Sequence, residues 1–267
     1  MHSDDAPPSD DTGPHYDQIG KAHPLAYAGY DFPPYAGPRR TYVIATSYRS
    51  GSHLLADLLM RSRCMGVPAE YFNLPNLARP LAWRMGIVPP IAPGRYLERL
   101  LTMRTSPNGV FGLKAHGDQI RPVLGSPTVR RFLRNSSFVW LRRRDVLAQA
   151  ISLEVAHQGH RWLRLRDYAP QGRTRPLTFE TAAIDGRLAD IAASDATWEE
   201  LFAVNGVTPI SIWYEDLLED PSRTCAPVFR MMGEQPRRLT LENSRFVRQD
   251  EPEKGEWRER YLQALRL

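Results

Sequence analysis

Thr41-Tyr-Val-Ile-Ala-Thr46, Ser47-Tyr-Arg-Ser-Gly-Ser-His53 and Leu54-Leu-Ala-Asp-Leu-Leu59 follow one another without a break, and together they decide the fold. The first block is β-branched and apolar, the second is rich in small residues, and the third has the apolar spacing of an amphipathic helix. They predict a strand, a tight loop and the first turns of a helix. This strand–loop–helix unit is typical of α/β proteins with a parallel sheet.

The loop in this unit has the features of an anion-binding site. Unpaired N–H groups and the positive end of the helix dipole favour a phosphate-like group at a helix N-terminus. Arg49 adds a charge, Gly51 lets the main chain approach a ligand, and Ser50 and Ser52 add hydroxyl donors. The loop is not a Walker A motif, because the second glycine and the lysine of that pattern are missing. An ordinary turn capped by serine remains the alternative.

Composition bounds the class of protein. The 267 residues, 42% of them hydrophobic, are enough for one large α/β domain. No apolar run approaches the roughly 20 residues that cross a bilayer, and the first residues lack a secretory pattern, so we expect a cytoplasmic protein without a transmembrane segment. Cys64 and Cys225 lie far apart without a histidine pattern, which predicts neither a disulfide nor a zinc site. The net charge of +5, mostly from arginine, fits nucleic acid or a phosphorylated small ligand.

The pattern along the chain predicts an arm followed by one domain. Residues 1–38 carry scattered prolines without a sustained period, which indicates an extended or partly disordered arm, and residues 39–267 form the single domain. Strand patterns alternate with helical ones, which predicts an α/β fold with a central parallel sheet and helices on both faces. Ligands of such sheets lie beyond the carboxyl ends of the strands. Four such ends are expected to converge on one crevice: residues 49–52, 114–116, 142–144 and 214–216.

A second anion site is indicated by Arg142-Arg-Arg-Asp, which directly follows an apolar strand pattern. Arg143 can hold a phosphate in bidentate fashion together with Ser152, two turns into the next helix. The alternative is a solvated helix cap, the commoner fate of an arginine run. Two separated anion sites describe a nucleotide with phosphates at both ends of its ribose.

Several blocks in order resemble the Stf0 family of sulfotransferases: residues 42–59, 68–72, 108–114, 143–152 and 248–250, with Trp257. The resemblance extends from about Tyr42 to Tyr261. It implies a P-loop-like three-layer fold and transfer of a sulfuryl group from 3′-phosphoadenosine 5′-phosphosulfate to a hydroxyl, by in-line displacement without a metal. The acceptor implied is a small molecule of carbohydrate type or a glycolipid, and a homodimer is implied as well.

The same resemblance assigns roles to the residues of the two anion sites. It implies that the 5′-phosphosulfate is bound by Arg49, Ser50, Gly51 and Ser52, next to His53, which replaces the family's usual threonine. It implies that Arg143 and Ser152 bind the 3′-phosphate, and that Arg248 belongs to a C-terminal segment that closes over the donor.

Two residues compete for the role of general base, which must take the proton of the acceptor hydroxyl. Glu70 occupies the position of the family's glutamate. Lys114-Ala-His116 resembles the lysine-x-histidine of cytosolic sulfotransferases, in which the histidine is the base. Lys114 is the expected point charge at the transferring group. Each also has an ordinary alternative: a surface carboxylate, a loop histidine and a lysine that extends from a strand end to solvent.

The remaining candidates concern the acceptor. Tyr71, Trp83, Tyr96 and Trp162 are expected either to stack on sugar rings or to belong to the core. The segment 158–166, next to His157, is a candidate for the acceptor site or a dimer contact.

Two other functions stay open as alternatives. A P-loop-like kinase would need the Walker lysine that is absent, together with a magnesium carboxylate. A basic nucleic-acid-binding protein would need basic and aromatic residues interleaved on one face. The preferred interpretation has no nucleic-acid partner.

Overall fold

The computed structural model describes residues 28–159, 162, 176–246 and 252–266. Its strands are β1 (Arg40–Thr46), β2 (Val110–His116), β3 (Ser137–Arg142) and β4 (Ile210–Trp213). They form one parallel sheet in the order β2-β1-β3-β4. The order reverses at β1, so the carboxyl ends of β1 and its two neighbours border the crevice in which ligands of such sheets bind.

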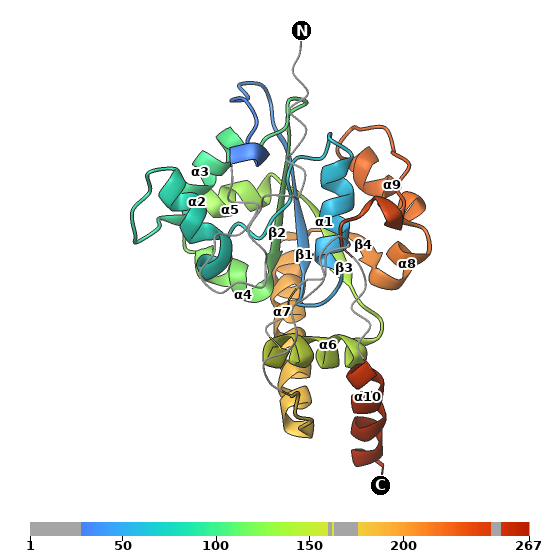
Figure 1. Ribbon diagram of the computed structural model, residues 1–267. Coiled ribbons are helices and arrows are strands. Elements are labelled where there is room, and N and C mark those ends of the chain that lie inside the picture. Colours follow the sequence, from blue (N-terminus) through green and yellow to red (C-terminus); the bar gives the residue numbers. More distant parts are fainter. Residues whose placement is uncertain (1–27, 160–161, 163–175, 247–251, 267) are drawn as a thin grey trace.

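The helices connect the strands and cover the sheet (Figure 1). Their bounds are α1 Ser52–Arg61, α2 Arg79–Arg84, α3 Pro93–Met103, α4 Gly117–Ile120, α5 Pro127–Arg134, α6 Val146–Gly159, α7 Thr181–Asn205, α8 Tyr214–Glu219, α9 Pro221–Met231 and α10 Pro252–Ala264. A π-helical turn, Leu74–Ala78, precedes α2, and 3-10 turns occur at Ala28–Tyr30, Arg121–Val123 and Leu241–Asn243.

Each face of the sheet has its own hydrophobic core. Alternate residues of β1 point to opposite faces, so Val43 packs with α2, α3, α5 and α7, whereas Ile44 packs with α1, α8 and α9. Figure 1 shows α2, α3 and α5 on one side of the strands and α1, α8 and α9 on the other. The predicted α/β fold, with a central parallel sheet and helices on both faces, is therefore confirmed.

Helix α7 fixes the carboxyl ends of the strands. Trp198 Nε1 and Ser194 Oγ donate to the Thr46 carbonyl at 3.2 and 3.3 Å, and Ser194 Oγ accepts from Gly117 N at 2.8 Å. Beyond the sheet, α7 packs with α6 and α10 around a third apolar cluster that includes Trp257 (Figure 1). These contacts provide a rigid support beneath the loops that follow β1 and β2.

Two features of the fold differ from what the sequence pattern predicts, helix α5 and the packing of the segment before β1. Helix α5 was not expected, because it is only eight residues long and carries three arginines, although Ser126 and Pro127 are local start signals and Val129, Phe132 and Leu133 have helical spacing. Within the described part of residues 1–38, Tyr30 is buried and Asp31 forms ion pairs with Arg84 and Arg104. No helix in the described ranges is both long and apolar enough to span a bilayer.

Candidate active site

The loop after β1 is shaped by its own hydroxyl groups. Ser50 is fully buried, and its Oγ donates to the Ser47 carbonyl at 2.9 Å and lies 2.5 Å from Thr46 Oγ1. Its hydroxyl therefore holds the loop in shape. Arg49 and Gly51 adopt positive φ angles of 59° and 88°, which turn the chain sharply into α1. Helix α1 begins after Gly51, and among the described residues no side-chain hydrogen bond caps its first turn, a kind of helix start that suits an anion.

Gly51 is required here for two independent reasons. Its φ lies in the left-handed region, and a Cβ at this position would lie 2.2 Å from Cδ2 of Tyr214. We expect Gly51→Ala to lower the free energy of unfolding by about 1–3 kcal/mol through backbone strain alone, with the collision added to it. Urea denaturation measures the loss.

Gly186→Ala provides the matched control for that substitution. Gly186 lies within α7, where a Cβ would meet none of the described residues within 4 Å, so alanine there should stabilise the helix by about 0.5–1 kcal/mol. A Gly51→Ala protein as stable as the wild type would show that Tyr214 and the loop rearrange without cost.

Arg49 connects the loop to α6. Its Nε donates to Ser152 Oγ at 3.1 Å, and its guanidinium also donates to the Trp162 carbonyl. Gln149, one turn earlier in α6, donates to the Tyr48 carbonyl at 2.6 Å. The residues predicted for the two ends of a bisphosphate thus meet at one place, the junction of the β1 loop and α6.

Arg143 lies on the other side of the same loop. Its guanidinium carbon is 5.1 Å from the ring centre of Tyr214, the side chain that covers Gly51. Arg143 therefore reaches the loop through Tyr214, whereas Arg49 belongs to the loop and connects it to Ser152. The expected convergence of the strand ends on one crevice agrees with this arrangement.

The neighbours of Arg143 in the arginine run contact other side chains. The guanidinium of Arg142 stacks on Trp140 and Trp213, at 3.7 and 4.3 Å from their ring centres. Arg144 donates two hydrogen bonds to Asp216, at 2.7 and 2.8 Å, on the protein surface. The arginine run therefore divides into residues with different tasks, which a run of identical letters does not reveal.

Glu70 lies at the centre of a buried ionic cluster. Its Oε1 is 2.9 Å from Lys114 Nζ, 3.4 Å from His53 Nε2 and 3.8 Å from His116 Nε2. Lys114 is only 2% exposed and Glu70 only 9%. The two competing bases thus face each other, and the predicted point charge lies between them and the β1 loop.

The second carboxylate oxygen of Glu70 is held by amides. Oε2 accepts from Gln119 Nε2 at 2.9 Å and from Asn73 Nδ2 at 3.0 Å. Sequence reasoning missed both amides. Each follows a candidate base by three residues, Asn73 after Glu70 and Gln119 after His116, and this spacing is the signal that would have found them.

Main-chain pairing brings Glu70 to β2. Lys114 N donates to the Ala69 carbonyl at 2.9 Å, in a parallel bridge between Ala69 and Leu113. Tyr71 is fully buried and stacks on Phe111 of β2, which anchors the segment from the other side. Because Ala69 and Tyr71 are both fixed, the side chain of Glu70 is directed at Lys114.

The charges in the cluster set its protonation. Burial acts to raise the pKa of Glu70, but Lys114, His116 and His53 outweigh it and hold that pKa well below its usual value. Burial lowers the pKa of Lys114, an effect that Glu70 opposes. Burial also lowers the pKa of His116. Near neutral pH, Glu70 is thus an anion, and burial favours the neutral imidazole of His116.

His53 belongs to this cluster in addition to the β1 loop. Its Nδ1 is 3.2 Å from Lys114 Nζ, and its ring lies 5.5 Å from that of Phe246. Since an ammonium group only donates, Nδ1 accepts from a charged Lys114 and Nε2–H then points at Glu70. The sequence predicted that His53 lies beside the residues that bind the 5′-phosphosulfate. In the structure it lies between the β1 loop and the candidate base Glu70.

The C-terminal segment reaches the same region. Asp57 of α1 accepts from Ser244 Oγ and from Arg245 N, both at 3.0 Å. This anchors the chain shortly before Arg248, which lies outside the described residues. The role expected for Arg248 stays a prediction.

The aromatic candidates separate by position. Tyr71 and Tyr96 are core residues, Trp83 is 78% exposed on α2, and Trp162 lies near Arg49. Both cysteines are buried free thiols. Across the described ranges, no group of three or more His, Cys, Asp or Glu side chains is arranged to hold a metal ion.

Known proteins are similar to this chain in sequence and in structure. Trehalose 2-sulfotransferase of Mycobacterium tuberculosis is 27% identical over 271 residues, covering 85% of this chain and 97% of that protein. The enzyme of the same name from Mycolicibacterium smegmatis is 26% identical, covering 82% and 93%. A crystal structure of a sulfotransferase from Alicyclobacillus acidocaldarius matches with a TM-score of 0.42 and 13% identity, covering 86% of this chain and 93% of the other. The model of the family described as Stf0 sulphotransferase matches residues 41–264, most of the chain, and the protein therefore belongs to the Stf0 sulphotransferase family.

Proposed function

We propose that this sulfotransferase moves a sulfuryl group from 3′-phosphoadenosine 5′-phosphosulfate to a hydroxyl of a carbohydrate acceptor. The observation that carries the proposal is the Glu70–Lys114 pair, which joins a buried carboxylate to a cation beside the anion loop. The two mycobacterial relatives are named for trehalose, which makes it the first acceptor to test.

The residues around the loop fit the two phosphates of such a donor. The first-turn N–H groups of α1 and the Arg49 guanidinium would hold the 5′-phosphosulfate. Arg143 and Ser152 would hold the 3′-phosphate, and Ser152 already hydrogen-bonds Arg49. The hydroxyl of Ser50 supports the loop, while its main chain and that of Gly51 are available to the ligand.

Glu70 would act as the base in the transfer. It takes the acceptor's hydroxyl proton while the acceptor oxygen bonds to sulfur and the bond from sulfur to the phosphate oxygen breaks, which releases adenosine 3′,5′-bisphosphate. Lys114, which contacts Glu70, would stabilise the negative charge that develops on the leaving oxygen. Gln119 and Asn73 hold the second oxygen of Glu70 and thereby orient the first. His116, whose Nε2 lies 3.8 Å from Glu70 Oε1, is the alternative base.

Thermal denaturation with ligands tests the donor assignment. Adenosine 3′,5′-bisphosphate at about 100 times its Kd should stabilise the fold by about 2.7 kcal/mol, because a ligand stabilises the state that binds it. ATP with magnesium and a single-stranded oligonucleotide are the comparison ligands. A larger melting shift with either of these than with the bisphosphate would favour a kinase or a nucleic-acid-binding protein instead.

Transfer itself is measured by mass spectrometry of trehalose incubated with enzyme and donor. The homodimer and the cytoplasmic location expected from the sequence stay predictions, which size-exclusion chromatography and cell fractionation test separately.

A further inference from the structure

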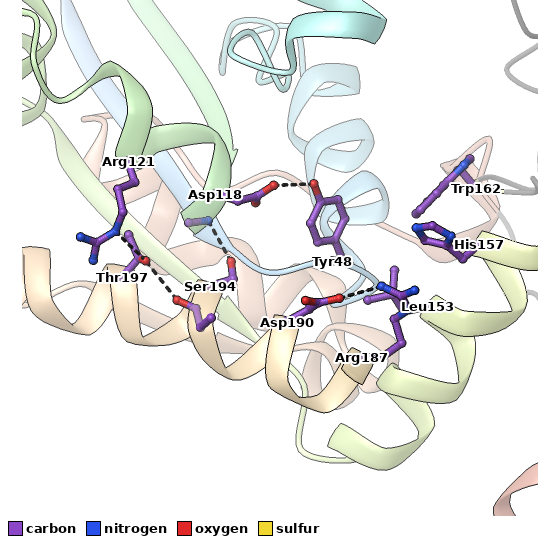
Figure 2. A pocket seen from close by; sticks show the side chains of 12 residues that line it. Tyr48, Asp118, Arg121, Leu153, His157, Trp162, Arg187, Asp190, Ser194 and Thr197 are labelled. Atoms are coloured by element: carbon purple, nitrogen blue, oxygen red, sulfur yellow. Dashed lines mark hydrogen bonds and ion pairs between the residues drawn. The ribbon is translucent and has the colours of Figure 1, made fainter. Parts of the chain in front are cut away.

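A cavity of about 470 Å³ lies between α4, α6 and α7, beside the loop that follows β1. Figure 2 shows Tyr48 at its centre, Asp118 above it, Arg187 and Asp190 below it, and His157 with Trp162 at one side. The volume is within the range of about 300–1,000 Å³ that is typical of small-molecule sites.

The cavity adjoins the active site through Tyr48. The Tyr48 ring centre is 4.0 Å from that of His116, and the Tyr48 hydroxyl donates to Asp118 Oδ2 at 2.8 Å. On the other side, the carbonyl of Trp162 accepts from Arg49. A molecule in the cavity would therefore lie next to both the base cluster and the donor loop.

Aromatic rings form one wall of the cavity. Trp162 lies 6.4 Å from Tyr48 and 5.7 Å from His157, between ring centres. Such rings present flat apolar faces on which the C–H faces of a sugar ring pack. Trp162 belongs to the sequence segment that was a candidate for the acceptor site.

The charged side chains of the cavity compensate one another. Arg187 pairs with Glu154 at 2.8 Å and with Asp190 at 2.7 Å, and Arg121 pairs with Glu200 at 2.5 Å. The cations thus already have carboxylate partners, which disfavours an anionic ligand. Asp118 and Asp190 keep further lone pairs, and a carboxylate accepts hydrogen bonds from hydroxyl groups.

We propose that this cavity binds the part of the acceptor that is not sulfated, a neutral polyhydroxylated ring such as the second sugar of a disaccharide. The reactive hydroxyl then reaches Glu70 past Tyr48. This inference rests on the proposed function, since it assigns the acceptor side of the same site.

Filling the cavity tests the assignment. Ala193 of α7 lines the cavity, whereas Ala192, the preceding residue, does not; because both are exposed, Ala193→Phe and Ala192→Phe form a matched pair. The probes are trehalose, maltose, cellobiose and lactose, each assayed for sulfation with the donor, alongside glucose 6-phosphate as the anionic comparison. Ala193→Phe should raise the KM of the disaccharide used by about tenfold or more, and Ala192→Phe should not change it. A second variant, Asp190→Asn, should also raise that KM.

The outcomes separate this inference from the proposed function. Melting shifts with adenosine 3′,5′-bisphosphate should be the same in all variants, which also shows that they fold. Loss of that shift in the wild type contradicts the proposed function. If that shift is normal, three results contradict the inference alone. They are that no neutral disaccharide is sulfated, that glucose 6-phosphate is preferred, or that Ala193→Phe leaves the KM unchanged.

Discussion

Replacing Glu70 by glutamine is expected to lower kcat by about 10²–10⁴-fold, the usual contribution of a positioned general base. Glutamine keeps the shape of the side chain but cannot take the acceptor proton. Binding of adenosine 3′,5′-bisphosphate should be unchanged, because Glu70 faces Lys114, His53 and the amides of Gln119 and Asn73. Steady-state sulfation kinetics and calorimetric titration measure the two effects.

The same substitution also has a structural consequence, which needs its own control. Lys114 is almost fully buried, and removing the carboxylate beside it leaves its charge without compensation, at a cost of about 3–5 kcal/mol in comparable pairs. Glu70→Asp keeps the charge but withdraws it by one methylene. It should therefore lose turnover with a smaller loss in melting temperature than Glu70→Gln.

His116 provides the contrast for the base assignment. His116→Asn should leave most of the turnover, because Glu70 is the proposed base and His116 Nε2 lies 3.8 Å from it, beyond hydrogen-bond distance. If turnover survives in Glu70→Gln and disappears in His116→Asn, then His116 is the base and Glu70 serves to orient it.

Replacing Arg143 by alanine is expected to weaken binding of adenosine 3′,5′-bisphosphate by about 10- to 100-fold, the equivalent of one or two charge-assisted hydrogen bonds. Arg143 lies beside Tyr214, which covers the glycine of the donor loop. Arg49→Ala should weaken binding as well, and it also removes the hydrogen bond to Ser152. Calorimetric titration at fixed salt measures both losses.

Arg144→Ala is the matched control for Arg143→Ala. Its side chain is exposed and already bonded twice to Asp216, so its removal changes the net charge by the same amount at the next position of the chain. The Kd of the bisphosphate should stay within about twofold of the wild type, because exposed charges are screened by solvent and salt. Equal losses in Arg143→Ala and Arg144→Ala would mean that binding depends on net charge and not on a specific site.

Local signals were sufficient for most of the fold. The alternation of strand and helix patterns predicts the parallel sheet, and the small-residue loop after the first strand predicts the anion site at α1. Helix α5 escaped prediction because it is short and rich in arginine, although Val129, Phe132 and Leu133 have helical spacing and pack it on α3 and β2. Elements of this kind depend on tertiary contacts more than on their own propensity.

Only part of the candidate site could be predicted from local sequence patterns. The sequence by itself determined the sheet, the loop at Gly51 and the two candidate bases, because each has a local pattern or a family motif. Only the tertiary structure decided that Lys114, His116 and His53 form one cluster around Glu70, and that Arg142, Arg143 and Arg144 contact different side chains. The physical reason is that a buried charge is defined by partners from distant segments, and such partners leave no periodic trace along the chain.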